Sequence, residues 1–189
     1  MIVQADVSKE DNVKEIFEKT LRNFKTIDIL INNAAIQIRN HILDVSIEEW
    51  KAHLDINLTG AFLCSKEALK VMINNNYGKI INISSEGGKK AWSTGSSYCS
   101  SKFGMLGLTE ASASDVKDKE ININAICPSG VDTPLVRKSY PKLDFANIKL
   151  MESEDISKVV LFIASEEAKA IKGSFISVSA GQTLIDGNE

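Results

Sequence analysis

Short runs of β-branched residues alternate with amphipathic helical patterns along the whole sequence, and this alternation restricts the possible folds more than any other feature. The strand-like runs cover residues 1–7, 27–35, 78–85, 121–130 and 174–180. Helical patterns fill residues 8–24, 46–73, 96–115 and 153–165 between them. Because parallel strands need crossover connections, this alternation predicts a parallel sheet with helices on both faces. We therefore predict an α/β fold and a single domain over residues 1–189.

Two of the predicted helices carry a capping signal at their start. Ser8 is followed three residues later by Asp11, and Ser46 is followed at the same spacing by Glu49. An N-cap serine accepts a hydrogen bond from the third helical amide, and the acidic side chain can bond back to the amide of the serine. We expect the helices to begin directly after Ser8 and Ser46.

The composition argues against several classes of protein. Apolar residues make up 43% and charged residues 25% of the chain, as in globular proteins. The net charge of -3 and the lack of a basic run predict no nucleic-acid partner. No apolar stretch approaches membrane-spanning length and no signal peptide is evident, so we predict no membrane association. The cysteines have no CxxC spacing and histidines are few, which predicts reduced thiols, a cytoplasmic location and no metal site; these residues are Cys64, Cys99, Cys127, His41 and His53.

Polar residues follow the predicted strands at the edge where parallel sheets bind their ligands. The carboxyl ends of the strands share that edge, and ligands bind in the crevice outside it. Asn33 and Ser85 follow the second and third strands, and residues 128–133 follow the fourth. Tyr98 and Lys102 lie in the first turns of the helix after the third strand. We expect a hydroxyl, a phenol and an ammonium group to converge there.

The spacing of Tyr98 and Lys102, one helical turn, suits proton transfer. A tyrosine with a pKa of about 10 is a poor acid or base at neutral pH, but a nearby cation stabilises the phenolate and lowers the pKa. We expect Lys102 to do this, so that Tyr98 exchanges a proton with an alcohol while Ser85 donates to the oxyanion. The chemistry implied is interconversion of an alcohol and a carbonyl compound. A Tyr-x-x-x-Lys pair also arises by chance in helices, so further motifs must decide.

The order and spacing of those further motifs closely resemble the short-chain dehydrogenase/reductase family. Asn57 lies 28 residues before Ser85, and Ser85 lies 13 residues before Tyr98, as in the catalytic tetrad of that family. The matching segments span almost the whole chain: "ADV" at 5–7, "NNAA" at 32–35, "INLTGAF" at 56–62, "IINISS" at 80–85 and "NAICPSGVDTP" at 124–134. The resemblance implies a Rossmann-like doubly wound sheet. It also implies an NAD- or NADP-dependent oxidoreductase that interconverts a small polar secondary alcohol and its ketone.

The resemblance further implies a role for each matching residue. Tyr98 would be the general acid or base, and Lys102 its cation and a contact of the cofactor ribose. Ser85 would bind the substrate oxygen, and Asn57 would hold a water molecule that relays protons to Lys102. Cofactor contacts would come from Asp6 and Val7 beside the adenine, from Asn33, Ala34 and Ala35 along the cofactor, and from Val131 and Thr133 at the nicotinamide carboxamide.

Three features depart from the pattern of the family. The usual Pro-Gly after the fourth strand is Pro128-Ser129, and a serine disfavours backbone angles that glycine permits, so we expect an altered nicotinamide loop. Residues 135–154 are shorter than the substrate lid of the family, which predicts a more open site or a lid partly disordered without ligand. The N-terminal strand, glycine-rich turn, helix and second strand of the family have no counterpart in this sequence, which would make the domain N-terminally truncated.

The missing unit leaves two hypotheses open: an active oxidoreductase, or a truncated, non-catalytic Rossmann-like protein unable to bind its cofactor. Without a glycine-rich turn and a helix N-terminus the pyrophosphate lacks a neutralising site, so we expect these 189 residues to bind NAD(P) weakly or not at all. We expect residues 1–5 either to pair against the strand at residues 28–32 or to stay detached. Some covering of that apolar edge, by these residues or by another subunit, is favoured, because a bare edge promotes aggregation.

Substrate and assembly follow from the resemblance alone. The segment "AAIQIRNH" is similar to sugar-acid and 3-hydroxybutyrate dehydrogenases of the family, in which case Arg39 or His41 would face a carboxylate. The favoured alternative for both residues is a solvated loop. The family pairs subunits through the helix at residues 47–73 and the helix after Tyr98, so we expect a homodimer or homotetramer. The small residues of these helices that would allow close approach are Ala61, Ala68, Gly104, Gly107, Ala111 and Ala113.

Overall fold

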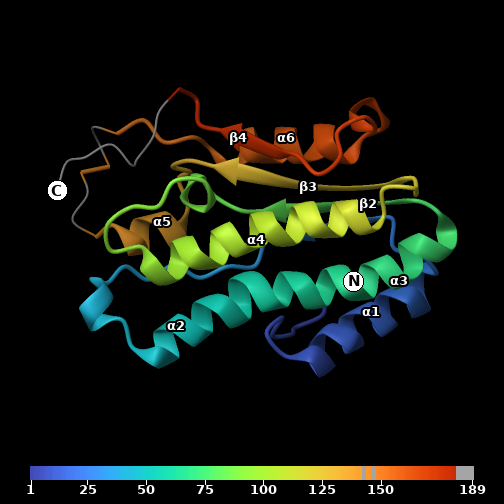
Figure 1. Cartoon of the computed structure of the whole chain (residues 1–189), viewed down its shortest axis with the longest axis horizontal. Coiled ribbons are helices and arrows are strands. Elements are labelled where there is room, and N and C mark those ends of the chain that lie inside the picture. Colours follow the sequence, from blue (N-terminus) through green and yellow to red (C-terminus); the bar gives the residue numbers. More distant parts are fainter. Residues whose placement is uncertain (142–143, 146–147, 182–189) are drawn as a thin grey trace.

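The centre of the molecule is a sheet of four parallel strands (Figure 1), seen in a computed structural model that describes residues 1–141, 144–145 and 148–181. The strands are β1 Ile29–Asn32, β2 Gly78–Ile83, β3 Ile121–Pro128 and β4 Phe175–Val178, and they lie side by side in the order β1-β2-β3-β4. In register, Ile31 pairs with Ile81, and Ile81 pairs with Asn124. The predicted α/β fold with a parallel sheet is therefore confirmed.

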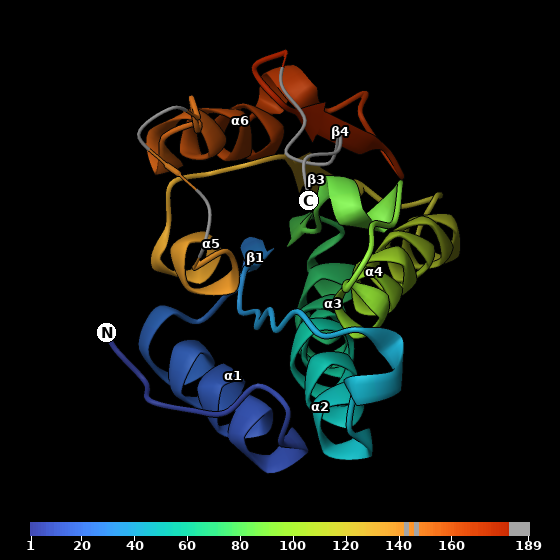
Figure 2. The same cartoon turned by 90° about the vertical axis from the view of Figure 1, so that its left-hand side faces the viewer.

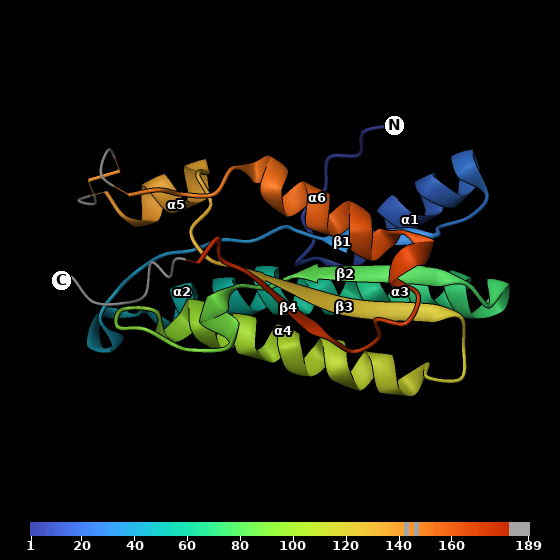
Figure 3. The ribbon, with the colours of Figure 1, turned by 90° about the horizontal axis from the view of Figure 1, so that it is seen from above.

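Helices cover both faces of this sheet (Figure 3). On one side lies α6 Ser153–Ala164, and on the other lie α2 Ile47–His53, α3 Gly60–Asn75 and α4 Ser96–Asp115, while α1 Glu10–Phe24 lies beyond the β1 edge and packs with α3. Shorter elements complete the chain: α5 Pro134–Ser139 and the 3₁₀ turns η1 Ile42–Asp44, η3 Glu86–Gly88 and η4 Glu166–Ala168. None of the helices in the described ranges is both long and apolar enough to cross a bilayer.

The two central strands are buried on both faces, and the polar side chains that they carry are buried with them, namely Lys79, Asn82, Asn122 and Asn124. Every residue of β3 is buried, and so are all residues of β2 except Ile83. On the side of α6, Ile81 and Ile126 pack against Ile163. These contacts fix β2 and β3, whose carboxyl ends carry most of the candidate site.

Helix α1 lies beyond β1, beside α2 and α3 (Figure 2). Val13 and Phe17 of α1 pack with Ala68 and Met72 of α3 in one apolar cluster. This stripe at helical spacing was the basis for predicting a helix here, and the structure confirms the helix. Its position leaves the outer edge of β1 open between α1 and α3.

The first predicted strand is wrong: residues 1–6 form no regular structure. The backbone amide and the hydroxyl of Ser8 both donate to Oδ1 of Asp6, at 2.9 and 2.7 Å, so Ser8 does not cap α1 and Lys9 holds the N-cap position instead. This turn leads into α1, and residues 1–5, which precede it, do not pair with β1. Residues 1–5 therefore do not cover that edge, and Ile29 and Ile31 of β1 are 47% and 46% exposed.

The long predicted helix at residues 47–73 is interrupted by one π-helical turn, η2 Leu54–Thr59, between α2 and α3. Ser46 caps α2 as predicted, because its hydroxyl accepts the Glu49 amide at 3.0 Å. The Glu49 carboxylate does not bond back to the amide of Ser46, as a full capping box would require. It accepts instead from Asn40 at 2.6 Å and from Ser97 at 3.3 Å. Glu49 thus joins the helix to the start of α4.

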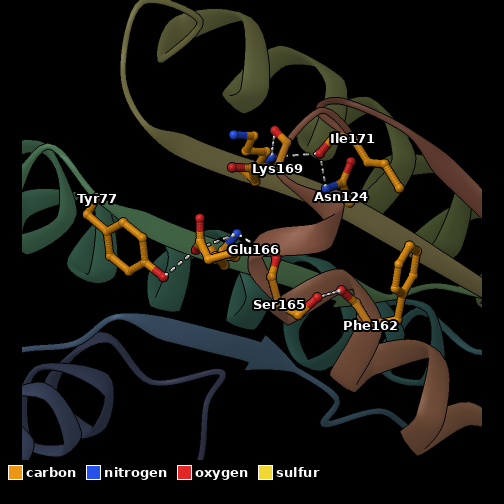
Figure 4. A network of polar contacts seen from close by, with 9 residues as sticks. Tyr77, Asn124, Phe162, Ser165, Glu166, Lys169 and Ile171 are labelled. Carbon is orange, nitrogen blue, oxygen red and sulfur yellow. Dashed lines mark hydrogen bonds and ion pairs between the residues drawn. The ribbon is translucent and has the colours of Figure 1, made fainter.

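At the opposite edge of the sheet, side chains of β2 and β3 hold the connection between α6 and β4 by its backbone (Figure 4). Asn122 donates to the carbonyls of Lys169 and Ile171, both at 2.8 Å. Lys79 donates to the carbonyl of Ser165 at 2.9 Å. Because buried carbonyls outside regular structure need partners, these bonds fix the connection and thereby the position of β4.

Candidate active site

A cavity of about 660 Å³ lies at the carboxyl ends of β1, β2 and β3. Ser85, Tyr98 and Lys102 all line it, so the structure brings together the hydroxyl, the phenol and the ammonium group. The roles that the sequence analysis gives to these residues remain predictions. The sheet edge explains the convergence, since Ser85 follows β2 and the other two residues lie on the helix that returns from it.

Ser85 is held against α4 by the residues on either side of it. The amide of Ser84 donates to the Ile126 carbonyl at 2.8 Å, and its hydroxyl donates to the Lys102 carbonyl at 3.1 Å. A Cβ atom at Gly88 would lie 2.7 Å from that same carbonyl oxygen. Only a glycine allows η3 to approach α4 this closely, and the approach places Ser85 next to Tyr98.

Tyr98 is buried and hydrogen-bonded to Ser85. Burial raises the pKa of Tyr98 to about 12, and the bond from Ser85 opposes this only in part. The direction is opposite to the lowering expected from Lys102. The reason is desolvation, which disfavours a buried phenolate. At neutral pH the phenol is therefore protonated.

Lys102 is buried below Tyr98. Its Nζ atom donates to the carbonyl of Ile83 at 2.8 Å and lies 5.7 Å from the centroid of the Tyr98 ring. Burial lowers the pKa of Lys102 to about 8. A group with a pKa of about 8 is still mostly protonated at neutral pH, so the site contains a buried ammonium group.

Asn57 lies in the π-helical turn η2 and is fully buried. Its Oδ1 accepts the Ile36 amide at 2.8 Å, and its Nδ2 donates to the Ile36 carbonyl and to Ser101 Oγ, both at 3.0 Å. A π turn inside a helix is often found at functional sites. The side-chain amide is used by protein groups, so the implied water relay through Asn57 remains a prediction.

The residues implied as cofactor contacts divide between two hollows on either side of the end of β1. Asn33, Ala35, Val131 and Thr133 line the cavity that contains Tyr98. A second groove of about 290 Å³, between α1 and β1, is lined by Val7, Ala34 and again Asn33. Asp6 lines neither hollow. Its carboxylate accepts from Ser8 instead.

The loop after β3 keeps an ordinary backbone despite the serine in place of glycine. Ser129 does not adopt a positive φ, and its amide donates to the Val178 carbonyl at 2.9 Å. The expected change at this position is therefore not found. Thr133 caps α5, because its hydroxyl accepts the Val136 amide at 3.3 Å. Part of the predicted lid, residues 142–143 and 146–147, lies outside the described residues.

Neither Arg39 nor His41 lines the cavity, so the hypothesis that they face a substrate carboxylate is wrong. The guanidinium of Arg39 lies 4.2 Å from the centroid of the Tyr140 ring, and its Nε donates to Thr94 Oγ1 at 3.0 Å. His41 is exposed and its Nδ1 accepts the Leu43 amide at 3.4 Å. Arg39 therefore supports the wall of the cavity from behind.

Sequence reasoning missed several residues of that wall: Gln37, Glu86, Trp92 and Tyr140. The Trp92 ring packs on Tyr98 with centroids 5.8 Å apart and 36° between planes. Cβ atoms at Gly87 and Gly95 would lie 2.3 and 2.7 Å from the indole. A tryptophan between two glycines was a usable signal for a fixed aromatic wall. Gln37 and Tyr140 gave no such signal.

These features match those of a known family. The sequence model described as "short chain dehydrogenase" matches residues 1–144. The chain belongs to the short-chain dehydrogenase/reductase family. It is 32% identical over 186 residues to a 3-oxoacyl-[acyl-carrier-protein] reductase of Synechocystis sp., covering 96% of this chain and 75% of that protein. It is 33% identical over 186 residues to trans-4-hydroxycyclohexanecarboxylate dehydrogenase of Sinomonas cyclohexanicum, covering 97% and 71%.

Solved structures of the family agree with the fold. ElxO with NADP bound superposes with a TM-score of 0.90 at 30% identity, covering 96% of this chain and 77% of that one. A Tyr-to-Phe variant of ElxO with NADPH bound gives a TM-score of 0.89. The Rossmann-like fold is thereby confirmed, and NAD- or NADP-dependent oxidoreduction is the activity of the family. The chain spans about three quarters of the length of these relatives.

The cavity residues fit the nicotinamide end of such a cofactor. Lys102 brings a buried ammonium group to the cavity, and within the described residues one acceptor, the Ile83 carbonyl, is hydrogen-bonded to it. Ribose hydroxyls would satisfy the remaining N–H donors, as a buried charge requires. Weak binding of NAD(P) by these 189 residues alone remains a prediction.

Proposed function

We propose that this protein interconverts a small polar ketone and its secondary alcohol, with Tyr98 as the proton donor for reduction. The observation that carries this proposal is the contact between Tyr98 and Ser85 inside the cavity that Lys102 also lines. A carbonyl oxygen placed against both hydroxyl groups would accept two hydrogen bonds. Because burial raises the pKa of Tyr98 to about 12, the phenol holds its proton at neutral pH and has one to give when a ketone is reduced.

During reduction the carbonyl carbon gains a hydride and the oxygen gains the proton of Tyr98. A reduced nicotinamide cofactor would supply the hydride when bound, and would itself be oxidised. Ser85 donates to the oxygen as negative charge develops on it. Lys102 would stabilise the phenolate that remains on Tyr98, since its Nζ atom lies 5.7 Å from the centroid of that ring.

The walls of the cavity support a substrate that is small and polar. Trp92 and Tyr140 limit its length, because Trp92 is fixed by the packing at Gly87 and Gly95. Oε1 of Glu86 is buried and lacks a hydrogen-bond partner among the described residues. A buried carboxylate oxygen needs a donor, and a hydroxyl group of the substrate would supply one once the side chain turned toward the cavity.

Assembly and location are further parts of the proposal. Phe62 on α3 and Phe103 on α4 are 45% and 44% exposed, on the two helices expected to pair subunits. Burial of these side chains between two copies would remove apolar surface from water. The three free cysteines, all buried, support a reducing compartment such as the cytoplasm.

The second candidate is a protein of this fold that does not turn over substrate. The open groove beside β1 and the exposed edge residues Ile29 and Ile31 favour it, because they lie where a longer sheet would continue. Calorimetric titration with NADH and NADPH comes first, followed by a panel of small hydroxylated ketones in an assay of cofactor oxidation. Binding with turnover supports the enzyme, and binding without turnover of any ketone or alcohol contradicts it. No binding at all supports the second candidate for this chain.

A further inference from the structure

His53 is a fully buried histidine one helical turn before Asn57, and no role in the reaction has been assigned to it. Its Nε2 atom lies 3.1 Å from the backbone nitrogen of Ile38, and its Nδ1 atom lies 2.9 Å from the carbonyl oxygen of Glu49. The ring also meets the ring of Tyr98 edge-on, with centroids 6.5 Å apart and 81° between planes. The side chain therefore joins three parts of the site.

The two backbone partners assign the tautomer of His53. The amide of Ile38 can only donate, so Nε2 must present its lone pair, and the carbonyl of Glu49 can only accept, so Nδ1 must carry the hydrogen. This requires the neutral imidazole with its proton on Nδ1. The other neutral tautomer would lose both bonds.

His53 and Asn57 together hold the segment that leaves β1. Asn57 binds both the amide and the carbonyl of Ile36, and His53 binds the amide of Ile38. The residue between them, Gln37, lines the cavity that contains Tyr98. Successive backbone groups of an extended segment point to opposite sides. The carbonyl of Gln37 therefore points away from the helix, and it accepts from Ser139 of α5 at 3.1 Å.

The segment is thus fixed by the helix on one side and by α5 on the other. The Gln37 side chain also lies beside Tyr140, which lines the same cavity. Loss of the bond at Ile38 would release Gln37 and Tyr140 together while the anchor at Ile36 remained. Such a loss would widen the cavity next to Tyr98 without moving the cofactor contacts that precede Ile36.

We propose that His53 is a positioning residue for the reaction: through Ile38 it holds the wall formed by Gln37 and Tyr140 against the catalytic Tyr98. This inference rests on the proposed function for its effect on turnover. The anchoring itself does not depend on turnover. The two can therefore be tested separately.

The test compares His53→Leu with His53→Gln in the full chain. Leucine removes both bonds, whereas the glutamine amide can still accept from Ile38. We expect hydrogen exchange of the Ile38 amide to quicken about tenfold or more in His53→Leu, to stay close to the parent rate in His53→Gln, and to leave the Ile36 amide unchanged in both. In the parent protein, ¹⁵N NMR of the imidazole should show Nε2 without a proton.

The turnover readout then decides the effect on the reaction. We expect kcat/KM for the ketone to fall about tenfold or more in His53→Leu, mostly through KM, with the cofactor Kd within about twofold of the parent and with recovery in His53→Gln. Unchanged Ile38 exchange in His53→Leu, or a proton on Nε2 in the parent, would overturn the anchoring. Released Ile38 with unchanged kcat/KM would overturn the effect on the reaction. A parent protein that binds cofactor but turns over no ketone would overturn the proposed function and leave the anchoring result standing.

Discussion

The Nζ atom of Lys102 donates to the carbonyl of Ile83, the last residue of β2, over 2.8 Å. This bond places an ammonium group inside the protein with an uncharged partner. The pKa of Lys102 falls to about 8 because burial disfavours the charged form. The site therefore contains a charge that lowers the stability of the fold. Active sites commonly contain groups that are needed for activity and reduce stability.

Lys102→Met should raise the free energy of unfolding at neutral pH. With a folded pKa of about 8 against 10.5, the buried charge costs about 3 kcal/mol, and the unpaired Ile83 carbonyl in the variant returns about 1 kcal/mol of that. Between these two pKa values the unfolded chain binds more protons, so the parent gains stability as pH rises and the difference shrinks. Urea unfolding at about pH 7 and pH 9.5 measures this.

The control for Lys102 is Lys51→Met, at an exposed position of α2. It should change the free energy of unfolding by about 0.5 kcal/mol or less at either pH. A Lys102→Met variant that is less stable than the parent at neutral pH would show that the ammonium group is better compensated than its burial indicates. Turnover of the Lys102 variant should be lost regardless.

Tyr98→Phe should abolish turnover and leave the fold intact, because only the titrating oxygen is removed. A general acid contributes about 10² to 10⁴ in rate, and we expect kcat/KM to fall within or beyond that range. The free energy of unfolding should change by only about 1 kcal/mol, the value of the single bond to Ser85. Tyr77→Phe, which removes a hydroxyl bonded to Glu166 far from the cavity, should keep full turnover. A Tyr98→Phe variant with parental kcat/KM would rule out Tyr98 as the proton donor.

Asn122→Ala should lower the free energy of unfolding, although it removes only one buried polar side chain. Its amide satisfies the carbonyls of Lys169 and Ile171, and the variant leaves both without that donor. The Ile171 carbonyl keeps the bond from Asn124 at 2.8 Å, so only the Lys169 carbonyl loses its side-chain donor. We expect a loss of about 1 to 3 kcal/mol in the free energy of unfolding, measured with urea. Asn74→Ala, at an exposed position of α3, should change it by about 0.5 kcal/mol or less. Equal stabilities of the two variants would mean that the α6–β4 connection is held by other contacts.

Phe103→Glu should shift the protein toward monomers, because a carboxylate would be buried wherever two copies pair through α3 and α4. Sedimentation velocity at micromolar concentration should show a dimer or tetramer for the parent and a smaller species for the variant. Phe24→Glu, which changes a phenylalanine on α1 that is 59% exposed, should leave the oligomer unchanged. A parent protein that sediments only as a monomer would contradict the assembly.

The elements with strong local signals could be predicted from the sequence. Helix α1 follows the apolar stripe of Val13 and Phe17, β3 follows a run of isoleucines that ends at Pro128, and α2 follows the cap at Ser46. Each signal comes from residues within one or two turns of each other. Residues 1–7 carried a β-branched signal of the same kind, but a strand also needs a partner, and the turn at Asp6 carries the chain away from β1.

The sequence by itself determined that Ser85, Tyr98 and Lys102 share one site. Ser85 ends a strand and the other two residues begin the next helix, and both segments lie at the same edge of a parallel sheet. Only the tertiary structure decided how they titrate. Burial, which depends on every element packed around the cavity, raises the pKa of Tyr98 to about 12 and lowers that of Lys102 to about 8. The wall of Gln37, Trp92 and Tyr140 and the contact of His53 with Ile38 were likewise decided by packing. These contacts join residues far apart in the chain, and their energy cannot be predicted from a local sequence pattern.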